Sequence, residues 1–129
     1  MMVDTKLKDK RTVVVGASPN PSRYAFLAAE MLTQGGYEMI PVGIKKGEVF
    51  GKMIQDIRSR PRINGVHTIT LYIGPEHQPE WYEYLLGLKP KRIIFNPGTE
   101  NEPFMKLAAD AGIEVTVACT LVMLRTKQY

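Results

Sequence analysis

The sequence contains a single cysteine, Cys119, among its 129 residues. One cysteine cannot form an internal disulfide, and with only two histidines beside it there is no recognisable spacing of zinc ligands. No segment approaches the ~18 apolar residues of a membrane-spanning helix, and the opening MMVDTKLKDK is too charged for a signal peptide. We therefore expect a soluble, cytoplasmic protein with no metal centre and no membrane association.

An excess of acidic residues is also absent, because 17 Lys and Arg stand against 13 Asp and Glu, a net charge of +4. This balance suits an anionic ligand, but the charges are too dispersed to predict a nucleic-acid-binding protein. The length and the 44% content of hydrophobic residues allow one domain with a core of its own. Since no linker or repeat interrupts the chain, we expect a single domain over residues 1–129.

Five segments are rich in β-branched residues and bounded by glycine or proline, as expected of short strands buried in a sheet. They cover residues 12–16, 37–42, 67–73, 92–96 and 113–118. Between them, apolar residues recur at helical spacing in rows that contain Tyr24, Trp81 and Phe104. One more short helix is expected around residues 53–57.

This alternation of strands and helices predicts an α/β protein with a three-layer, doubly wound, mostly parallel sheet of about five strands. An α+β sandwich is the weaker alternative, because the strands are nearly unbroken apolar runs of the kind buried on both faces. The row that contains Trp81 is interpreted as a face that covers the sheet.

The loop GASPNPSR follows the first predicted strand. In a doubly wound sheet, ligands bind beyond the carboxyl ends of the strands where the strand order reverses, which is normally next to strand one. Gly16 can form the tight turn, and the N–H groups of residues 17–22 with the positive end of the following helix can receive a phosphate. Ser18 or Ser22 can add a hydroxyl, and Arg23 a charged contact.

The loop differs from a dinucleotide fingerprint, because G-x-G-x-x-G needs glycine where this chain has Ser18 and Pro21. NAD recognition would also place an acidic residue after the second strand, whereas PVGIKKGEVFGK places Lys45 and Lys46 there. Basic side chains at this place favour a ligand with a further phosphate on its ribose. NADP and coenzyme A (CoA) both carry one.

At this level of detail the chain resembles the small stand-alone CoA-binding proteins. These are in turn similar to the N-terminal CoA-binding domain of the succinyl-CoA synthetase α subunit. The resemblance rests on VVVGASPNPSRYA, GYEMIPVGIKKGEVFGK and NPGTENEPFMKLAADAGIEVTVACT, and it covers about residues 10–124. It implies a Rossmann-like fold that holds CoA or an acyl-CoA.

The same resemblance implies positions for the ligand. Around the phosphates it places Gly16, Ala17, Ser18, Pro19 and Arg23. Beside the adenosine it places Pro41, Val42 and Lys45 or Lys46, and along the ligand the turn that contains Ile73, Gly74 and Pro75. Asn96 and Gly98 stand near the pantetheine arm.

The chain departs from the family pattern in two segments. The family's P-V-N-P ends here in Gly43 and Ile44, and its D-R-C-x-x-x-E retains Cys119 but has Ala118 and Met123 in place of the arginine and glutamate. We interpret Cys119 as a buried, inert thiol rather than a partner of the CoA thiol. The synthetase's phosphorylated histidine belongs to a further domain, so ligase chemistry is not implied.

No nucleophile with a patterned base, metal set or acid/base pair is visible in the sequence, which favours binding without catalysis. The leading hypothesis is a CoA or acyl-CoA binding protein. One alternative is an NADP-binding oxidoreductase-like domain. The other is a degenerate nucleotide-binding fold that recognises another protein, or a second copy of itself, through the helix at Trp81 or residues 43–62.

Overall fold

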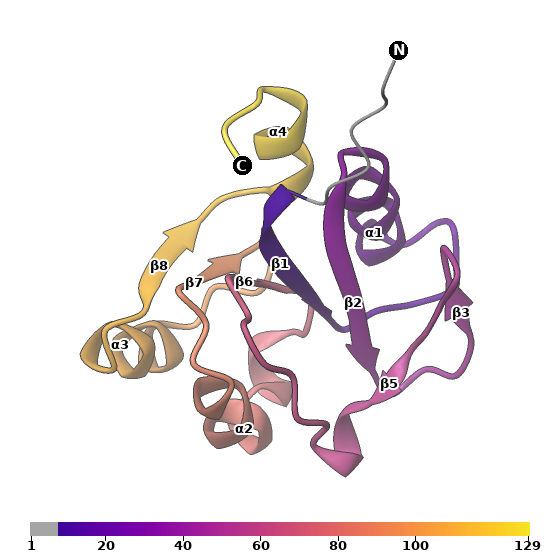
Figure 1. The fold of residues 1–129 in the computed structure, drawn as a ribbon. Helices are drawn as coiled ribbons and strands as arrows, with labels where there is room; N and C mark the ends of the chain where they lie inside the picture. Colours follow the sequence, from indigo (N-terminus) through magenta and orange to yellow (C-terminus); the bar gives the residue numbers. More distant parts are fainter. Residues whose placement is uncertain (1–7) are drawn as a thin grey trace.

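The computed structural model describes residues 8–129 and contains a six-stranded sheet between helices (Figure 1). The strand order is β5-β2-β1-β6-β7-β8, and all neighbouring strands are parallel. The strands are β1 (Lys8–Val15), β2 (Tyr37–Gly43), β5 (Gln55–Asp56), β6 (Thr68–Leu71), β7 (Arg92–Phe95) and β8 (Glu114–Val117). A separate antiparallel hairpin is formed by β3 (Glu48–Val49) and β4 (Lys52–Met53).

In residues 8–129, three α-helices connect strands of the sheet, and a fourth follows the last strand: α1 (Tyr24–Gln34), α2 (Tyr82–Gly87), α3 (Glu102–Asp110) and α4 (Thr120–Arg125). Short 3-10 turns cover Ile57–Ser59, Pro75–His77 and Pro79–Trp81. Figure 1 shows α1 and α4 close together, while α2 and α3 lie apart from them. The predicted three-layer, doubly wound, Rossmann-like fold is confirmed.

Alternating strand residues separate the core into two layers, because successive side chains of a strand point to opposite faces. On one face Val13 and Ile93 pack in a cluster with Leu85 of α2 and Phe104 of α3. On the other face Val14 and Ile94 share a cluster with Ala29 and Leu32 of α1 and with Leu124 of α4. Trp81 lies in the first cluster, so its interpretation as a core residue is confirmed.

The helix expected around residues 53–57 is wrong. Met53 ends β4, Gln55 and Asp56 form β5 beside β2, and Ile57 opens a 3-10 turn. The two residues of β5 are exposed and carry no apolar alternation, so only their pairing with Val42 and Gly43 defines the strand. This short edge strand is the sixth member of a sheet that the sequence predicted with about five.

Candidate functional site

The register of the sheet brings the loops after β1, β2, β6 and β7 to one edge. Val15, the last residue of β1, pairs with Val42 on one side and with Leu71 on the other. Leu71 in turn pairs with Phe95. Since these strands are parallel, their carboxyl ends meet at this edge, with β1 at the point where the chain order reverses. This is the place predicted for the ligand.

Gly16 makes the turn that leaves β1. Its φ is +96°, and a Cβ atom there would lie 2.7 Å from the carbonyl oxygen of Tyr72. The N–H groups of Gly16 and Ala17 both donate to the carbonyl oxygen of Val42, at 2.9 and 3.1 Å. The start of the loop is therefore fixed between the ends of β2 and β6.

The rest of the loop is folded around Asn20, which was not predicted as a site residue. The Asn20 N–H donates to Ser18 Oγ at 3.1 Å, and Asn20 Oδ1 accepts from Ser22 N and Ser22 Oγ at 3.0 and 2.8 Å. The Asn20 carbonyl accepts from Arg23 N at 3.0 Å. Asparagine between two prolines is a signal for such a turn, because its side chain bonds to the backbone two residues later.

These bonds change which donors are available to a phosphate. Most N–H groups of residues 17–22 have acceptors within the protein, and Pro19 and Pro21 have no N–H. Among residues 8–129, the amides around this loop that lack an acceptor are those of Ser18, Tyr24 and Ala25. Two of the three open α1, where the helix dipole is positive. A phosphate would thus lie over the start of α1 rather than along the whole loop.

The loop after β2 contacts the loop after β1. A Cβ atom on Gly47 would lie 3.2 Å from Cβ and Cγ of Pro19, which places Gly47 against the Pro19 ring. Lys45 and Lys46 precede Gly47 and are exposed, as is Arg23 at the N-cap of α1. None of these three cations forms an ion pair with another described residue. The structure therefore brings together the two predicted basic segments.

Asp56 is the carboxylate whose charge Lys46 affects, but it is bound by another residue. Arg58 Nε donates to Asp56 Oδ1 at 2.9 Å, and this hydrogen bond is the main reason that the pKa of Asp56 is lowered. Lys46 adds only the smallest contribution to that lowering. Asp56 is therefore engaged mainly by Arg58 and not by the loop after β2.

Pro41 and Val42 are placed differently from the expectation that they flank an adenosine. Both side chains are buried in β2, so they pack in the core beneath the loops and are not at the surface. The apolar side chains that do reach the surface near this loop are Ile44, 58% exposed, and Phe50, whose ring centroid lies 4.9 Å from that of Phe26. The sequence places Ile44 and Phe50 in the segment that shows least regularity, which is why they were missed.

The turn after β6 is joined to the turn after β7 by Gln78, a further residue that was not predicted. Its buried side chain donates from Nε2 to the carbonyl oxygens of Ile73 and Thr99, at 2.8 and 2.9 Å. Its Oε1 accepts from Asn101 at 2.9 Å. Gly98 lies on the exposed part of the β7 loop. Gln78 thus fixes the turn that carries Ile73, Gly74 and Pro75.

Asn96 lies inside the protein and is only 2% exposed. Its Nδ2 donates to Thr70 Oγ1 and to the carbonyl oxygen of Leu71, at 2.8 and 2.9 Å, and its Oδ1 accepts from Thr120 N at 2.9 Å. The side chain is therefore occupied in joining β6, β7 and the start of α4. This arrangement supports the loops but does not present the amide to a pantetheine arm.

Groups with catalytic potential are few at this edge. Cys119 is the N-cap residue of α4 and is partly rather than fully buried. Burial raises the pKa of Tyr72 to about 12, so its phenol stays protonated near neutral pH. Residues 8–129 contain no group of three or more His, Cys, Asp or Glu that could hold a metal ion. Nor does this part of the chain contain a helix that is long and apolar enough to cross a membrane.

The fold and the site define a Rossmann-like α/β protein with two adjoining basic loops at the carboxyl edge of its sheet. The model of a protein family described as a CoA binding domain matches residues 10–125, so the chain belongs to this family. A search of curated proteins found no match.

Solved structures are similar over most of the chain. A crystal structure of an uncharacterized protein is 54% identical, with a TM-score of 0.90 over 93% of this chain and 98% of that one. Prb, a protein redesigned for binding, is 22% identical with a TM-score of 0.81 over 92% and 83% of the two chains. A hypothetical protein from Pyrococcus horikoshii OT3 is 23% identical with a TM-score of 0.79 over 99% and 96%. The last two show a likeness of fold alone.

Proposed function

We propose that the protein binds CoA or an acyl-CoA at the carboxyl edge of its sheet and catalyses no reaction on it. The observation that carries this proposal is the contact between two loops whose cations, Arg23, Lys45 and Lys46, form no ion pair with a described residue. Membership of a family of CoA binding domains, matched over residues 10–125, supports the choice of ligand. A cytoplasmic location and a single binding domain are parts of the same proposal.

In this proposal the diphosphate lies over the start of α1. The amides of Ser18, Tyr24 and Ala25 donate to it, and Arg23 supplies a positive charge beside them. Gly16, Ala17, Pro19 and Ser22 shape this loop rather than bind through their side chains.

The remaining parts of the ligand follow the two neighbouring loops. Lys45 and Lys46 bind the 3′-phosphate, and the adenine rests on Ile44 or Phe50 above the buried Pro41 and Val42. The pantetheine arm runs past Gly98 and the turn from Ile73 to Pro75.

NADP binding is the second candidate function, because a lysine pair after β2 would suit a 2′-phosphate as well as a 3′-phosphate. The two are separated by melting temperatures measured with CoA, dephospho-CoA, NADP and NAD in parallel. A ligand at ~100 times its dissociation constant adds ~2.7 kcal/mol of stability, or several degrees at this size. We expect the largest rise with CoA. A larger rise with NADP would favour the oxidoreductase-like alternative, and no rise with any nucleotide would favour a protein-interaction module.

The Arg23→Ala variant is expected to bind CoA roughly tenfold more weakly, since it loses a hydrogen-bonding charge beside the diphosphate. Its stability should stay within ~0.5 kcal/mol of the parent, because the Arg23 side chain makes no hydrogen bond or ion pair with a described residue. Calorimetric titration with CoA measures the affinity. Arg125→Ala, an exposed arginine at the end of α4, is the matched control and should leave it unchanged. Equal affinity in the parent and Arg23→Ala would refute the assignment of the diphosphate.

The double variant Lys45→Ala, Lys46→Ala is expected to weaken CoA roughly tenfold and dephospho-CoA less than about twofold, because only CoA carries the 3′-phosphate. The same titration with both ligands measures this difference. Lys106→Ala, an exposed lysine of α3, controls for loss of general positive charge. If both ligands lose affinity equally, the lysines do not recognise the 3′-phosphate.

A further inference from the structure

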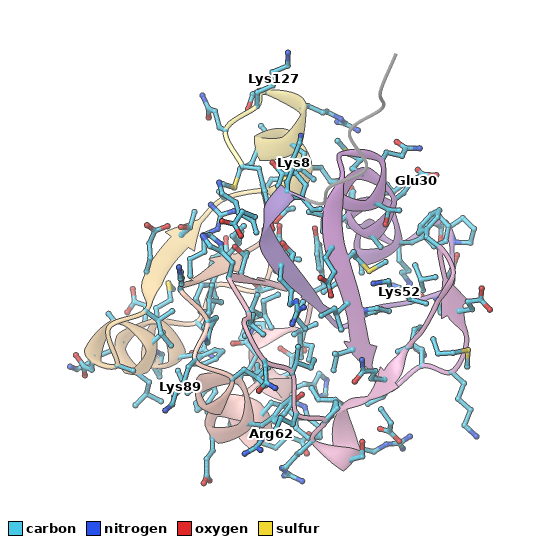
Figure 2. The ribbon with its side chains drawn as sticks, in the orientation of Figure 1. Lys8, Glu30, Lys52, Arg62, Lys89 and Lys127 are labelled. Atoms are coloured by element: carbon cyan, nitrogen blue, oxygen red, sulfur yellow. The ribbon has the colours of Figure 1, made fainter. Side chains whose placement is uncertain are left out.

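A concave surface lies at the end of the sheet opposite the proposed CoA site. This amino-edge cleft has a volume of about 910 Å³ and is formed around the start of β1 and the segments that lead into β6 and β7. Figure 2 labels three of its lining residues, Lys8, Arg62 and Lys89. Its volume is within the ~300–1,000 Å³ typical of sites for small molecules. The CoA site proposed above lies at the carboxyl edge, so the two are separate.

The residues that line this cleft carry the surplus of positive charge of the chain. It is lined by six Lys and Arg side chains and two carboxylates, a surplus of four positive charges: Lys8, Lys10, Arg11, Arg62, Lys89 and Lys91 against Asp9 and Glu38. The net charge of the whole chain is also +4, so the remaining residues sum to zero. The positive charge of this protein is therefore concentrated at one end of the sheet.

The two carboxylates are already counted in this surplus, and one of them is engaged by a single cation. Glu38 is already paired with Arg11, with 3.2 Å between Oε2 and Nε. Arg62, Lys89 and Lys91 form no ion pair with any residue between 8 and 129. Three cations thus face the cleft without a counter-ion from the described chain.

A chain of hydrogen bonds connects the lining of the cleft with a positively charged side chain below the surface. His67 Nδ1, on the lining, lies 2.7 Å from Thr68 Oγ1, which accepts from Arg92 Nε at 2.7 Å. Arg92 is only 8% exposed, and its Nη2 has no hydrogen-bond partner among the described residues. The Arg92 guanidinium lies 4.4 Å from the centroid of the Tyr129 ring, so its charge is partly compensated, but the unsatisfied Nη2 is still costly to bury.

The ionisation of His67 responds to the same charges. Burial lowers the pKa of His67, and Arg92, Lys10 and Lys91 lower it further, while Glu114 alone opposes them. An anion in the cleft would reverse this effect, because a negative charge favours the imidazolium form. A rise in the pKa of His67 therefore indicates that an anion occupies the cleft.

We propose that the amino-edge cleft is a second ligand site, which binds a small oligophosphate anion. The concave shape and clustered cations suit a compact ligand with several negative charges. A single-stranded nucleic acid fits less well, since no Phe, Tyr or Trp lines the cleft to stack on bases. This site does not depend on CoA binding at the other edge.

Tripolyphosphate is the probe that tests this site, with proton NMR of the two histidines as the readout. We expect tripolyphosphate to raise the pKa of His67 and to leave the NMR signals of His77 in place, because His77 lies in the turn after β6, away from the cleft. A shift confined to His77, or no shift at His67, would overturn the proposal. An oligonucleotide that shifts His67 at lower concentration than tripolyphosphate would also overturn it, in favour of a nucleic-acid site.

Variants at each edge separate this proposal from the CoA proposal. Lys89→Ala combined with Lys91→Ala should weaken tripolyphosphate roughly tenfold, through loss of two exposed charge contacts, with CoA affinity unchanged. The Lys45→Ala, Lys46→Ala variant should bind CoA more weakly and tripolyphosphate as tightly as the parent does, so the response of His67 to tripolyphosphate should be retained. If the cleft variant responds to tripolyphosphate as the parent does, these lysines do not form the site, whatever the result with CoA.

Discussion

The Gly16→Ala variant is expected to lose about 3 kcal/mol of its free energy of unfolding and to bind CoA poorly even when folded. A φ of +96° strains any residue with a Cβ atom, at a cost of ~1–2 kcal/mol. The added Cβ would also lie 2.7 Å from the oxygen and 2.9 Å from the carbon of the Tyr72 carbonyl. Because those atoms are backbone, relief requires movement of β1 away from β6, at a typical ~1–3 kcal/mol.

Gly51→Ala is the matched control for this variant. Gly51 also has a positive φ, +82°, but nothing lies within 4 Å of the Cβ atom that alanine would add. It should therefore lose only the ~1 kcal/mol of backbone strain. Urea unfolding of both variants measures the difference, and calorimetry measures CoA affinity. Equal losses at the two positions would show that the contact with Tyr72 costs nothing and that the turn is free to move.

The parallel sheet was predictable because its central strands are buried on both faces. Residues such as Val13, Val14, Ile93 and Ile94 must be apolar whichever face of the sheet they point to. Each strand therefore appears in the sequence as an almost continuous run of apolar residues. The strand β5 has no such requirement, since Gln55 and Asp56 are exposed at the edge. Where burial does not select the side chains, the sequence contains no pattern from which a strand could be predicted.

The edge of the sheet at which the candidate site lies was predictable from the buried parallel strands. The backbone N–H groups that are free to donate there were not predictable. The loops at Gly16 and Lys45 follow two strands whose carboxyl ends must meet in a doubly wound sheet. Which amides remain free depends on the bonds that Asn20 makes within the loop and on the acceptance of two N–H groups by Val42. These partners depend on local backbone geometry, so the sequence indicated more free N–H groups in the loop than the structure has.

The two ends of the sheet differ in a way that composition alone could not reveal. A net charge of +4 over 129 residues is modest and looks dispersed in the sequence. The fold gathers residues from the start of β1, the segment before β6 and the segment before β7 at one edge. Charges that are far apart along the chain thereby form one basic surface at the amino edge of the sheet. The lysines after β2 lie at the carboxyl edge.

The Asn96→Ala variant distinguishes a supporting residue from a ligand contact. We expect a loss of about 3 kcal/mol in the free energy of unfolding, because the substitution removes the buried hydrogen bonds of Asn96 to the Leu71 carbonyl and from the Thr120 N–H. An unsatisfied buried group costs ~1–3 kcal/mol. Asn64→Ala, at an exposed position whose side chain makes no hydrogen bond with described residues, should change stability by less than ~0.5 kcal/mol. Thermal or urea unfolding measures both values.

Binding measurements on the folded Asn96→Ala variant complete this test. CoA and 3′,5′-ADP share the adenosine and the 3′-phosphate, but only CoA has the pantetheine arm near which Asn96 was predicted to lie. If Asn96 only joins β6, β7 and α4, the variant should change the affinity for both ligands by the same factor. A loss specific to CoA would instead show that the amide leaves Thr70 and Thr120 to meet the arm, and the buried network seen here would then be one of two arrangements.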